Sequence, residues 1–176
     1  MINLQTAKDN EPEWQKIYSA SFPNIEQMPI KQLFKMSNDE TSNAHAAFIN
    51  INGNNVGIVY YVTSADETKA FILYLAINSK FRGGGYGSQA VQFLRDRFSN
   101  GIILECEMID DQADNSVERE RRYDFYLRNG MQNSGILSHT LGGTFYLLRS
   151  SIKIDAADYL NCLKTVGLTA TLINVD

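Results

Sequence analysis

Cysteine, histidine and proline are scarce in this sequence. Its 176 residues include two cysteines, two histidines and three prolines. Two cysteines are too few for a disulfide scaffold, and no spacing of cysteine and histidine matches a zinc site. We therefore predict no metal site, and we expect Cys106 and Cys162 to be reduced thiols with a structural role.

A surplus of positive charge and long apolar runs are also missing. Lysine and arginine number 16 against 20 aspartates and glutamates, for a net charge of −4, whereas proteins that bind nucleic acids present a cationic surface. No apolar run approaches the roughly 20 residues that span a bilayer. Residues 1–10 lack the basic start and apolar middle of a secretory signal. These absences predict a cytoplasmic protein with no nucleic-acid or membrane partner.

The composition favours one domain over residues 1–176, since 44% of the residues are hydrophobic. Apolar spacing predicts an α/β (α+β) fold. Asn52-Gly53 between two apolar runs indicates a hairpin, and three antiparallel strands are expected in a meander. The strands are predicted around Ile2 and Leu4 and at 46–51, 56–62, 70–77, 102–108, 136–141 and 144–148. The helices are predicted after Asn10, after Pro29, at 88–98, after Asn115 and after Asp155.

Three residues are predicted to cap helices. Asn10, Asn115 and Asp155 each precede a helical pattern, and Glu118 stands three residues after Asn115, as in a capping box. The segment after residue 168 is expected to be a strand or a loose tail.

A glycine-rich loop joins strand 70–77 to helix 88–98. The four glycines are Gly83, Gly84, Gly85 and Gly87. They let the backbone approach a ligand closely, and their N–H groups lie at the positive end of the following helix. This combination predicts a cradle for an anion, most naturally phosphate, although a simple flexible turn is the alternative.

Two other phosphate-binding motifs fit the loop less well. A Walker loop is excluded because no Lys-Ser or Lys-Thr follows the glycines. A dinucleotide-binding motif shares the order of strand, glycines, helix and strand, and Asp110-Asp111 follows at about the expected distance. Its glycine spacing differs, however, and the preceding strands are expected to be antiparallel.

The loop resembles the acetyl-CoA motif of the general N-acetyltransferase superfamily, GNAT, whose pattern is Gln/Arg-x-x-Gly-x-Gly/Ala. This sequence has Arg82-x-x-Gly85-x-Gly87 after an apolar strand. Phe125-Tyr126, ahead of Gly130, is similar to a second hallmark of that family, an aromatic-Tyr pair before Gly-Phe. The resemblance runs in the family's order from about residue 2 to residue 150. It implies a mixed, mostly antiparallel central sheet flanked by helices.

The resemblance also implies a binding site for acetyl-CoA as co-substrate. In that family the loop amides hold the CoA pyrophosphate, and the strand before the loop pairs with pantetheine through its backbone. The corresponding residues here are Leu75, Ala76, Ile77, Arg82, Gly83, Gly84, Gly85, Tyr86, Gly87 and Ser88.

Acetyl transfer to a primary amine requires the loss of a proton from the amine, since an alkyl ammonium has a pKa near ~10.4. The resemblance implies that Tyr126 is the general acid for the departing thiolate. It also implies that Glu105 is the general base. Glu105 shares one face of strand 102–108 with Glu107 and Ile103, and we expect burial and the Glu107 charge to raise its pKa. The alternatives are a core aromatic at 126, a solvated carboxylate at 105, Glu107 as the base, and deprotonation through water.

Several residues and functions stay open at this stage. Family members commonly carry an Asn seven residues before the Tyr, and Arg119 stands there in this sequence. The charged run 118–122 is expected to be a solvated helix face; the alternative places Arg122 near the CoA phosphates. His139 is expected on the surface of a strand. The resemblance implies that residues 22–29 and the later loops select the acceptor, a small-molecule or peptide amine. A non-catalytic acyl-CoA-binding module and a nucleotide-binding protein remain alternatives, and a homodimer is left open.

Overall fold

One β-sheet runs through the whole molecule. The structure is a computed structural model, and it describes residues 1–175. Within these residues, eight strands form a single sheet in the order β1-β2-β3-β4-β5-β7-β6-β8. The strands are β1 (Ile2–Thr6), β2 (Ala44–Ile51), β3 (Asn54–Thr63), β4 (Lys69–Ile77), β5 (Gly101–Glu107), β6 (Gln132–Thr140), β7 (Gly143–Arg149) and β8 (Thr171–Asn174).

The strand directions confirm the mixed, mostly antiparallel sheet. Strands β4 and β5 are parallel, and all the other neighbouring strands are antiparallel. Strands β2, β3 and β4 form the predicted meander. Asn52 and Gly53 have φ values of 51° and 87°, the left-handed conformation that the Asn-Gly hairpin signal requires.

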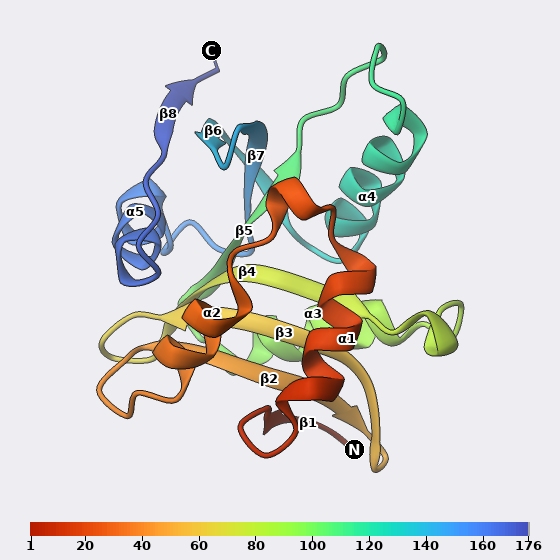
Figure 1. Ribbon diagram of the computed structural model, residues 1–176. Coiled ribbons are helices and arrows are strands. Elements are labelled where there is room, and N and C mark those ends of the chain that lie inside the picture. The colour runs from red at the N-terminus through yellow and green to blue at the C-terminus, as the bar shows by residue number, and fades with distance from the viewer. Residues whose placement is uncertain (176) are drawn as a thin grey trace.

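Helices cover both faces of the sheet (Figure 1). Figure 1 shows α1 and α2 in front of strands β2 to β4, with α3 behind them. None of the helices within residues 1–175 has the length and apolarity needed to cross a membrane. The α-helices are α1 (Glu11–Ser21), α2 (Ile30–Ser37), α3 (Tyr86–Arg97), α4 (Ser116–Arg128) and α5 (Ala156–Thr165), and two 3-10 turns are η1 (Asn24–Glu26) and η2 (Ser79–Phe81).

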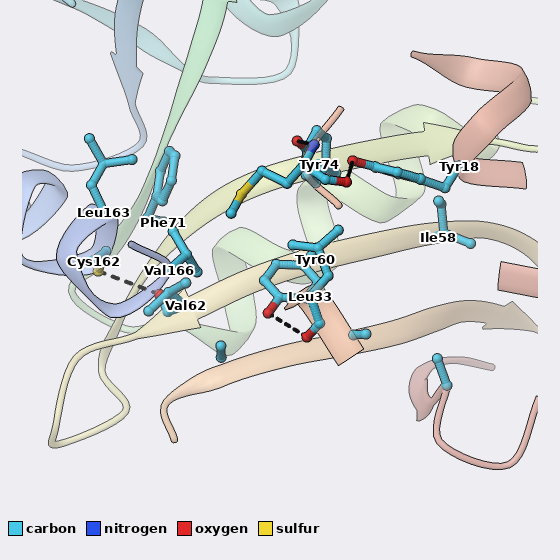
Figure 2. Packing of buried hydrophobic residues seen from close by; sticks show 14 of the residues in the cluster. Tyr18, Leu33, Ile58, Tyr60, Val62, Phe71, Tyr74, Cys162, Leu163 and Val166 are labelled. Atoms are coloured by element: carbon cyan, nitrogen blue, oxygen red, sulfur yellow. Dashed lines mark hydrogen bonds between the residues drawn. The ribbon is translucent and has the colours of Figure 1, made fainter. Parts of the chain in front are cut away.

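The first face of the sheet packs against α1, α2 and α5. Figure 2 shows Tyr60 of β3 and Phe71 of β4 in this layer, and both are fully buried. The Tyr60 hydroxyl donates a hydrogen bond to the backbone carbonyl of Leu33 at 3.0 Å, so its polar end is satisfied inside the core. Burial of each such aromatic side chain contributes roughly 1.5–3 kcal/mol.

The second face packs against α3 and α4. Helix α3 buries Ala90, Val91 and Leu94, which recur at helical spacing. On β5, Leu104 and Cys106 join this layer while Ile103 joins the first, so the alternation predicted for the strand is confirmed. Both cysteines are free and buried, as expected.

Two of the three predicted helix caps are wrong. The Asp155 side chain accepts hydrogen bonds from the backbone of Ala157 and Asp158 in a capping box, as predicted for α5. Asn10 and Asn115 stand at the N-cap positions but make no side-chain cap. The Asn115 Oδ1 instead accepts a hydrogen bond from the Nε of Arg119 at 2.8 Å, so its acceptor is already used.

Candidate active site

Strands β4 and β5 separate part of the way along their length. Their parallel register runs from Lys69 opposite Gly101 to Ile72 opposite Leu104 and ends there. The next residue, Leu73, is a bulge in the pairing of β4 with β3, which places Tyr61 opposite Ile72 and Tyr60 opposite Tyr74. A bulge bends its strand and increases its twist. Beyond Ile72, the edge of β4 that faces β5 is therefore available to an extended ligand.

A cavity of about 340 Å³ occupies this separation. Its walls come from β4, β5, α4 and the segment between α1 and α2, which lie far apart in the sequence. The lining residues include Leu75, Ala76 and Ile77 of β4, Glu105 and Glu107 of β5, Arg122, Phe125 and Tyr126 of α4, and Phe22 and Glu26. The two residues expected to transfer protons, Glu105 and Tyr126, thus border one cavity.

The glycine loop forms the N-terminus of helix α3. Gly85 is the N-cap with φ 74°, and Gly83 has φ 86°, both in the left-handed region that favours glycine. Within residues 1–175, no acceptor bonds the backbone N–H groups of Gly85, Tyr86, Gly87 and Ser88. These four donors point from the positive end of a twelve-residue helix. The loop is therefore suited to holding an anion.

The loop is continuous with the cavity. A second hollow, of about 200 Å³, is lined by the loop residues and shares Ile77, Arg82, Gly87 and Phe125 with the first. A Cβ atom at Gly87 would lie 3.2 Å from the Phe125 ring, so this glycine lets α3 approach α4. At Gly83 and Gly85 a Cβ would meet nothing within 4 Å, which leaves the space in front of the loop open.

Arg82 is exposed at the start of the loop. Its Nε lies 3.4 Å from the backbone oxygen of Ile77, at the end of β4. The guanidinium therefore lies where the strand and the loop meet.

Glu105 is a largely buried carboxylate with one defined partner. It lies on the face of β5 that packs toward α5, where the Tyr159 hydroxyl donates a hydrogen bond to its Oε1. The pKa of Glu105 is raised to about 7, mainly by burial; the hydrogen bond from Tyr159 acts to lower this pKa, and the neighbouring charge of Glu26 acts to raise it. The neighbouring carboxylate that raises this pKa is Glu26, not Glu107 as the sequence suggested.

Glu107 is in an ion-pair cluster with two arginines of α4. Its Oε2 accepts a hydrogen bond from Nη1 of Arg122, and its Oε1 lies 3.5 Å from Nη2 of Arg119. The two carboxylates of β5 therefore share a face but differ in their partners. Arg122 is not simply solvated, because it both pairs with Glu107 and lines the cavity.

Tyr126 is buried in the second face of the sheet and borders the cavity from α4. Burial raises the pKa of its hydroxyl above the usual value, so the phenol stays protonated at neutral pH. Phe125 stacks edge-on against it, with 5.3 Å between ring centroids, and faces the glycine loop. The two aromatics thus occupy separate positions.

Arg119 fixes the connection between β5 and α4. Its Nη1 donates to the backbone oxygen of Met108 at 3.1 Å, and its Nε donates to Asn115. These contacts attach both ends of the loop to the first turn of the helix. His139 is exposed, as predicted, with Nδ1 3.1 Å from the Thr144 hydroxyl.

Sequence reasoning missed three residues near Glu105. Tyr159 and Glu26 lie 54 and 79 positions from it along the chain, and Ser138 bonds Tyr159 in the buried first layer. Tyr159 and Ser138 have no motif of their own, and the apolar spacing of α5 indicates only that Tyr159 is buried. Within residues 1–175 no group of histidine, cysteine, aspartate or glutamate side chains is arranged to hold a metal ion.

The family model described as "Acetyltransferase (GNAT) family" matches residues 11–131. A search of curated protein sequences gives no significant match.

Three solved structures have a similar fold. A GNAT-family protein from Bacteroides thetaiotaomicron is 22% identical, with a TM-score of 0.67 over 90% of this chain and 91% of that chain. An aminoglycoside 6′-N-acetyltransferase complexed with coenzyme A is 17% identical, with a TM-score of 0.64 over 88% and 98%. The aminoglycoside 6′-N-acetyltransferase from Enterococcus faecium is 16% identical, with a TM-score of 0.62 over 88% and 98%.

Proposed function

Because the chain belongs to the acetyltransferase (GNAT) family, we propose that it transfers an acetyl group from acetyl-CoA to a primary amine. The observation that carries this proposal is the continuity of the glycine loop with the cavity that Glu105 and Tyr126 border. Phosphate binding and proton transfer are thereby provided along one groove. We also propose that residues 1–176 form one acetyltransferase domain, since β6 to β8 continue the same sheet.

The groove fits coenzyme A in both charge and shape. Four N–H groups at the start of α3 have no acceptor in the described part of the chain and suit a pyrophosphate, and Arg82 adds a positive charge beside them. Residues Leu75 to Ile77 offer an open strand edge to the amide groups of pantetheine. When bound, acetyl-CoA supplies an acetyl thioester that a neutral amine can attack. The structure with coenzyme A of a protein of similar fold supports this choice of donor.

Glu105 is proposed as the proton acceptor. An incoming ammonium must lose a proton before its nitrogen can attack, and a base with a pKa near the working pH is best matched to that task. The pKa of Glu105, raised to about 7 by burial, meets this condition. The carboxylate therefore takes the proton on an Oε atom, directly or through one water. Glu26 and Glu105 together favour a cationic acceptor in this part of the cavity.

Tyr126 is proposed as the proton donor. Its hydroxyl remains protonated because burial raises its pKa, and it borders the cavity opposite the face that carries Glu105. In this role the Oη donates its proton to the departing sulfur. The two proton-transfer groups thus lie on opposite sides of the opening between β4 and β5, with room between them for the reacting atoms.

The acceptor is a small-molecule or peptide amine in this proposal. Phe22, Pro23 and Glu26 of the segment between α1 and α2 line the cavity, so we expect this segment to contact the acceptor. Phe22 offers an apolar surface and Glu26 a negative charge. An amine with an apolar or hydroxylated body would use both.

The test is turnover. Purified protein is incubated with acetyl-CoA and a panel of diamines, aminoglycosides and peptides with free N-termini, and thiol release is followed over time. Release that depends on one class of amine, together with the acetylated product by mass spectrometry, supports the proposal. Tight binding of acetyl-CoA without turnover on any amine would indicate a non-catalytic acyl-CoA-binding module instead.

A further inference from the structure

Glu105 stands at the end of a hydrogen-bond chain that reaches into the C-terminal part of the molecule. Tyr159 of α5 donates to Oε1 of Glu105, and the Oγ of Ser138 on β6 lies 2.6 Å from the Tyr159 hydroxyl. Ser138 and Tyr159 both have 0% exposure. Both also lie beyond residue 131, where the match to the family model ends.

The direction of this chain follows from proton counting. A phenol carries a single proton, and Tyr159 donates it to the carboxylate of Glu105. The Tyr159 oxygen can therefore only accept from Ser138, whose hydroxyl must be the donor. Both donors point toward Glu105, an arrangement that favours the charged carboxylate over the neutral acid.

The other charged and titratable groups near Glu105 act differently. Glu26 on η1 and the Tyr74 hydroxyl on β4 face it, and the Glu26 carboxylate disfavours its ionised form. Glu107 on the same strand is paired with Arg119 and Arg122. Tyr159 is thus the side chain that supports the negative charge of Glu105 directly, against burial and the charge of Glu26.

We propose that Tyr159 is a positioning residue that keeps Glu105 ionised and correctly oriented for the proposed acetyl transfer, with Ser138 directing the Tyr159 hydroxyl. This inference depends on the proposed function, because it assigns Glu105 the role of base. It goes beyond that function by assigning part of the site to α5. The Tyr159 ring is held independently of its hydroxyl, edge-on to Phe71 with 5.0 Å between centroids.

The test is the substitution Tyr159→Phe, which keeps the ring and removes the hydroxyl. Loss of the hydrogen bond should move the acidic limb of the kcat/KM profile upward by about one pH unit. Activity should fall about tenfold on that limb and recover at high pH. Tyr60→Phe is the matched control, because it also removes the hydroxyl of a buried tyrosine; that hydroxyl donates to the backbone carbonyl of Leu33, and Tyr60 does not line the cavity. It should leave the limb in place.

Two further measurements make the outcomes distinguishable. Ser138→Ala should move the acidic limb of the kcat/KM profile in the same direction by a smaller amount. This variant replaces Tyr159→Phe in the test if Tyr159→Phe does not fold. Titration of Glu105 by carbon NMR, without acetyl-CoA, should show the same upward shift in Tyr159→Phe. A limb that disappears in Glu105→Gln but does not move in Tyr159→Phe would overturn this inference alone. A limb that survives in Glu105→Gln would overturn Glu105 as the base, and with it the role of Tyr159.

Discussion

The two carboxylates on one face of β5 have different neighbours. Glu107 forms ion pairs with two arginines of α4, and these pairs connect the helix to the strand. Glu105 has a tyrosine hydroxyl as its hydrogen-bonding partner, and burial raises its pKa to about 7. An acid of ordinary pKa would be too weak a base at neutral pH, whereas Glu105 can both hold and release a proton there.

Glu105→Gln should therefore remove the acidic limb of the kcat/KM profile. In the wild-type protein the base must be deprotonated, so activity should increase with pH through about 7, the pKa of Glu105. Glutamine keeps the shape of the side chain and an oxygen for Tyr159 but accepts no proton, so kcat/KM should fall by ~10²-fold or more. Rates measured from pH 5 to 9 test this.

Glu107→Gln is the control for charge. It removes an equal negative charge from the same face, yet we expect it to leave the limb in place. Equal loss of the limb in both variants would show that the electrostatic field of the cavity, rather than proton transfer at Glu105, sets the pH dependence.

Tyr126→Phe tests the proposed acid. The substitution keeps the aromatic packing against Phe125 and removes the only proton that the side chain could donate. We expect kcat to fall by ~10²-fold with little change in the affinity for acetyl-CoA. Steady-state rates and calorimetric binding measure the two quantities. A variant with the parental kcat would assign Tyr126 to packing alone.

At the scale of elements, the site depends on how the glycine loop starts α3. Helix formation leaves the first N–H groups without acceptors, and the left-handed Gly85 turns the chain so that those groups face the groove. The apolar strand β4 precedes the loop, and the twelve-residue helix α3 follows it. The position of these N–H groups is therefore set by the turn between the two elements.

Gly85→Val should abolish the binding of acetyl-CoA. A β-branched residue is strained at φ 74°, and its side chain would project into the open space in front of the loop. In the wild-type protein, acetyl-CoA should raise the melting temperature while NAD and ATP do not. The variant should lose this shift while still unfolding cooperatively. An undiminished shift in Gly85→Val would mean that the loop is only a turn.

Local patterns predict the elements well but not the contacts between them. A strand is identified by the alternation along residues 102–108 and by the apolar run at 70–77. Successive side chains of a strand point to opposite faces of the sheet, so the environment of each face is visible in the local sequence. The cap at Asn115 could not be excluded from sequence, since Arg119 competes for its side-chain oxygen. Tyr159 and Glu105 come into contact only in the folded sheet. They are 54 positions apart, so no local spacing in the sequence predicts their contact.

At the scale of the whole molecule, the sheet consists of two parts that differ in how their strands follow one another along the chain. Strands β1 to β4 form a consecutive antiparallel series, and β5 to β8 form the rest, with β7 placed between β5 and β6. The proposed proton acceptor, Glu105, lies on β5 of the second part, and the proposed donor, Tyr126, lies on α4, which follows β5; the open strand edge belongs to the first part. The groove exists because the two parts join over only a short length.

That short junction has a consequence for the way the protein opens. Four register pairs between β4 and β5 connect the halves of the sheet, and the halves should therefore behave as separate cooperative units in hydrogen exchange. Acetyl-CoA would contact both units, so it should slow exchange most at the amides of residues 101–104, which border the junction, and least between β2 and β3. Mass spectrometry of exchanged peptides measures this, and uniform protection across the sheet would argue for a single unit.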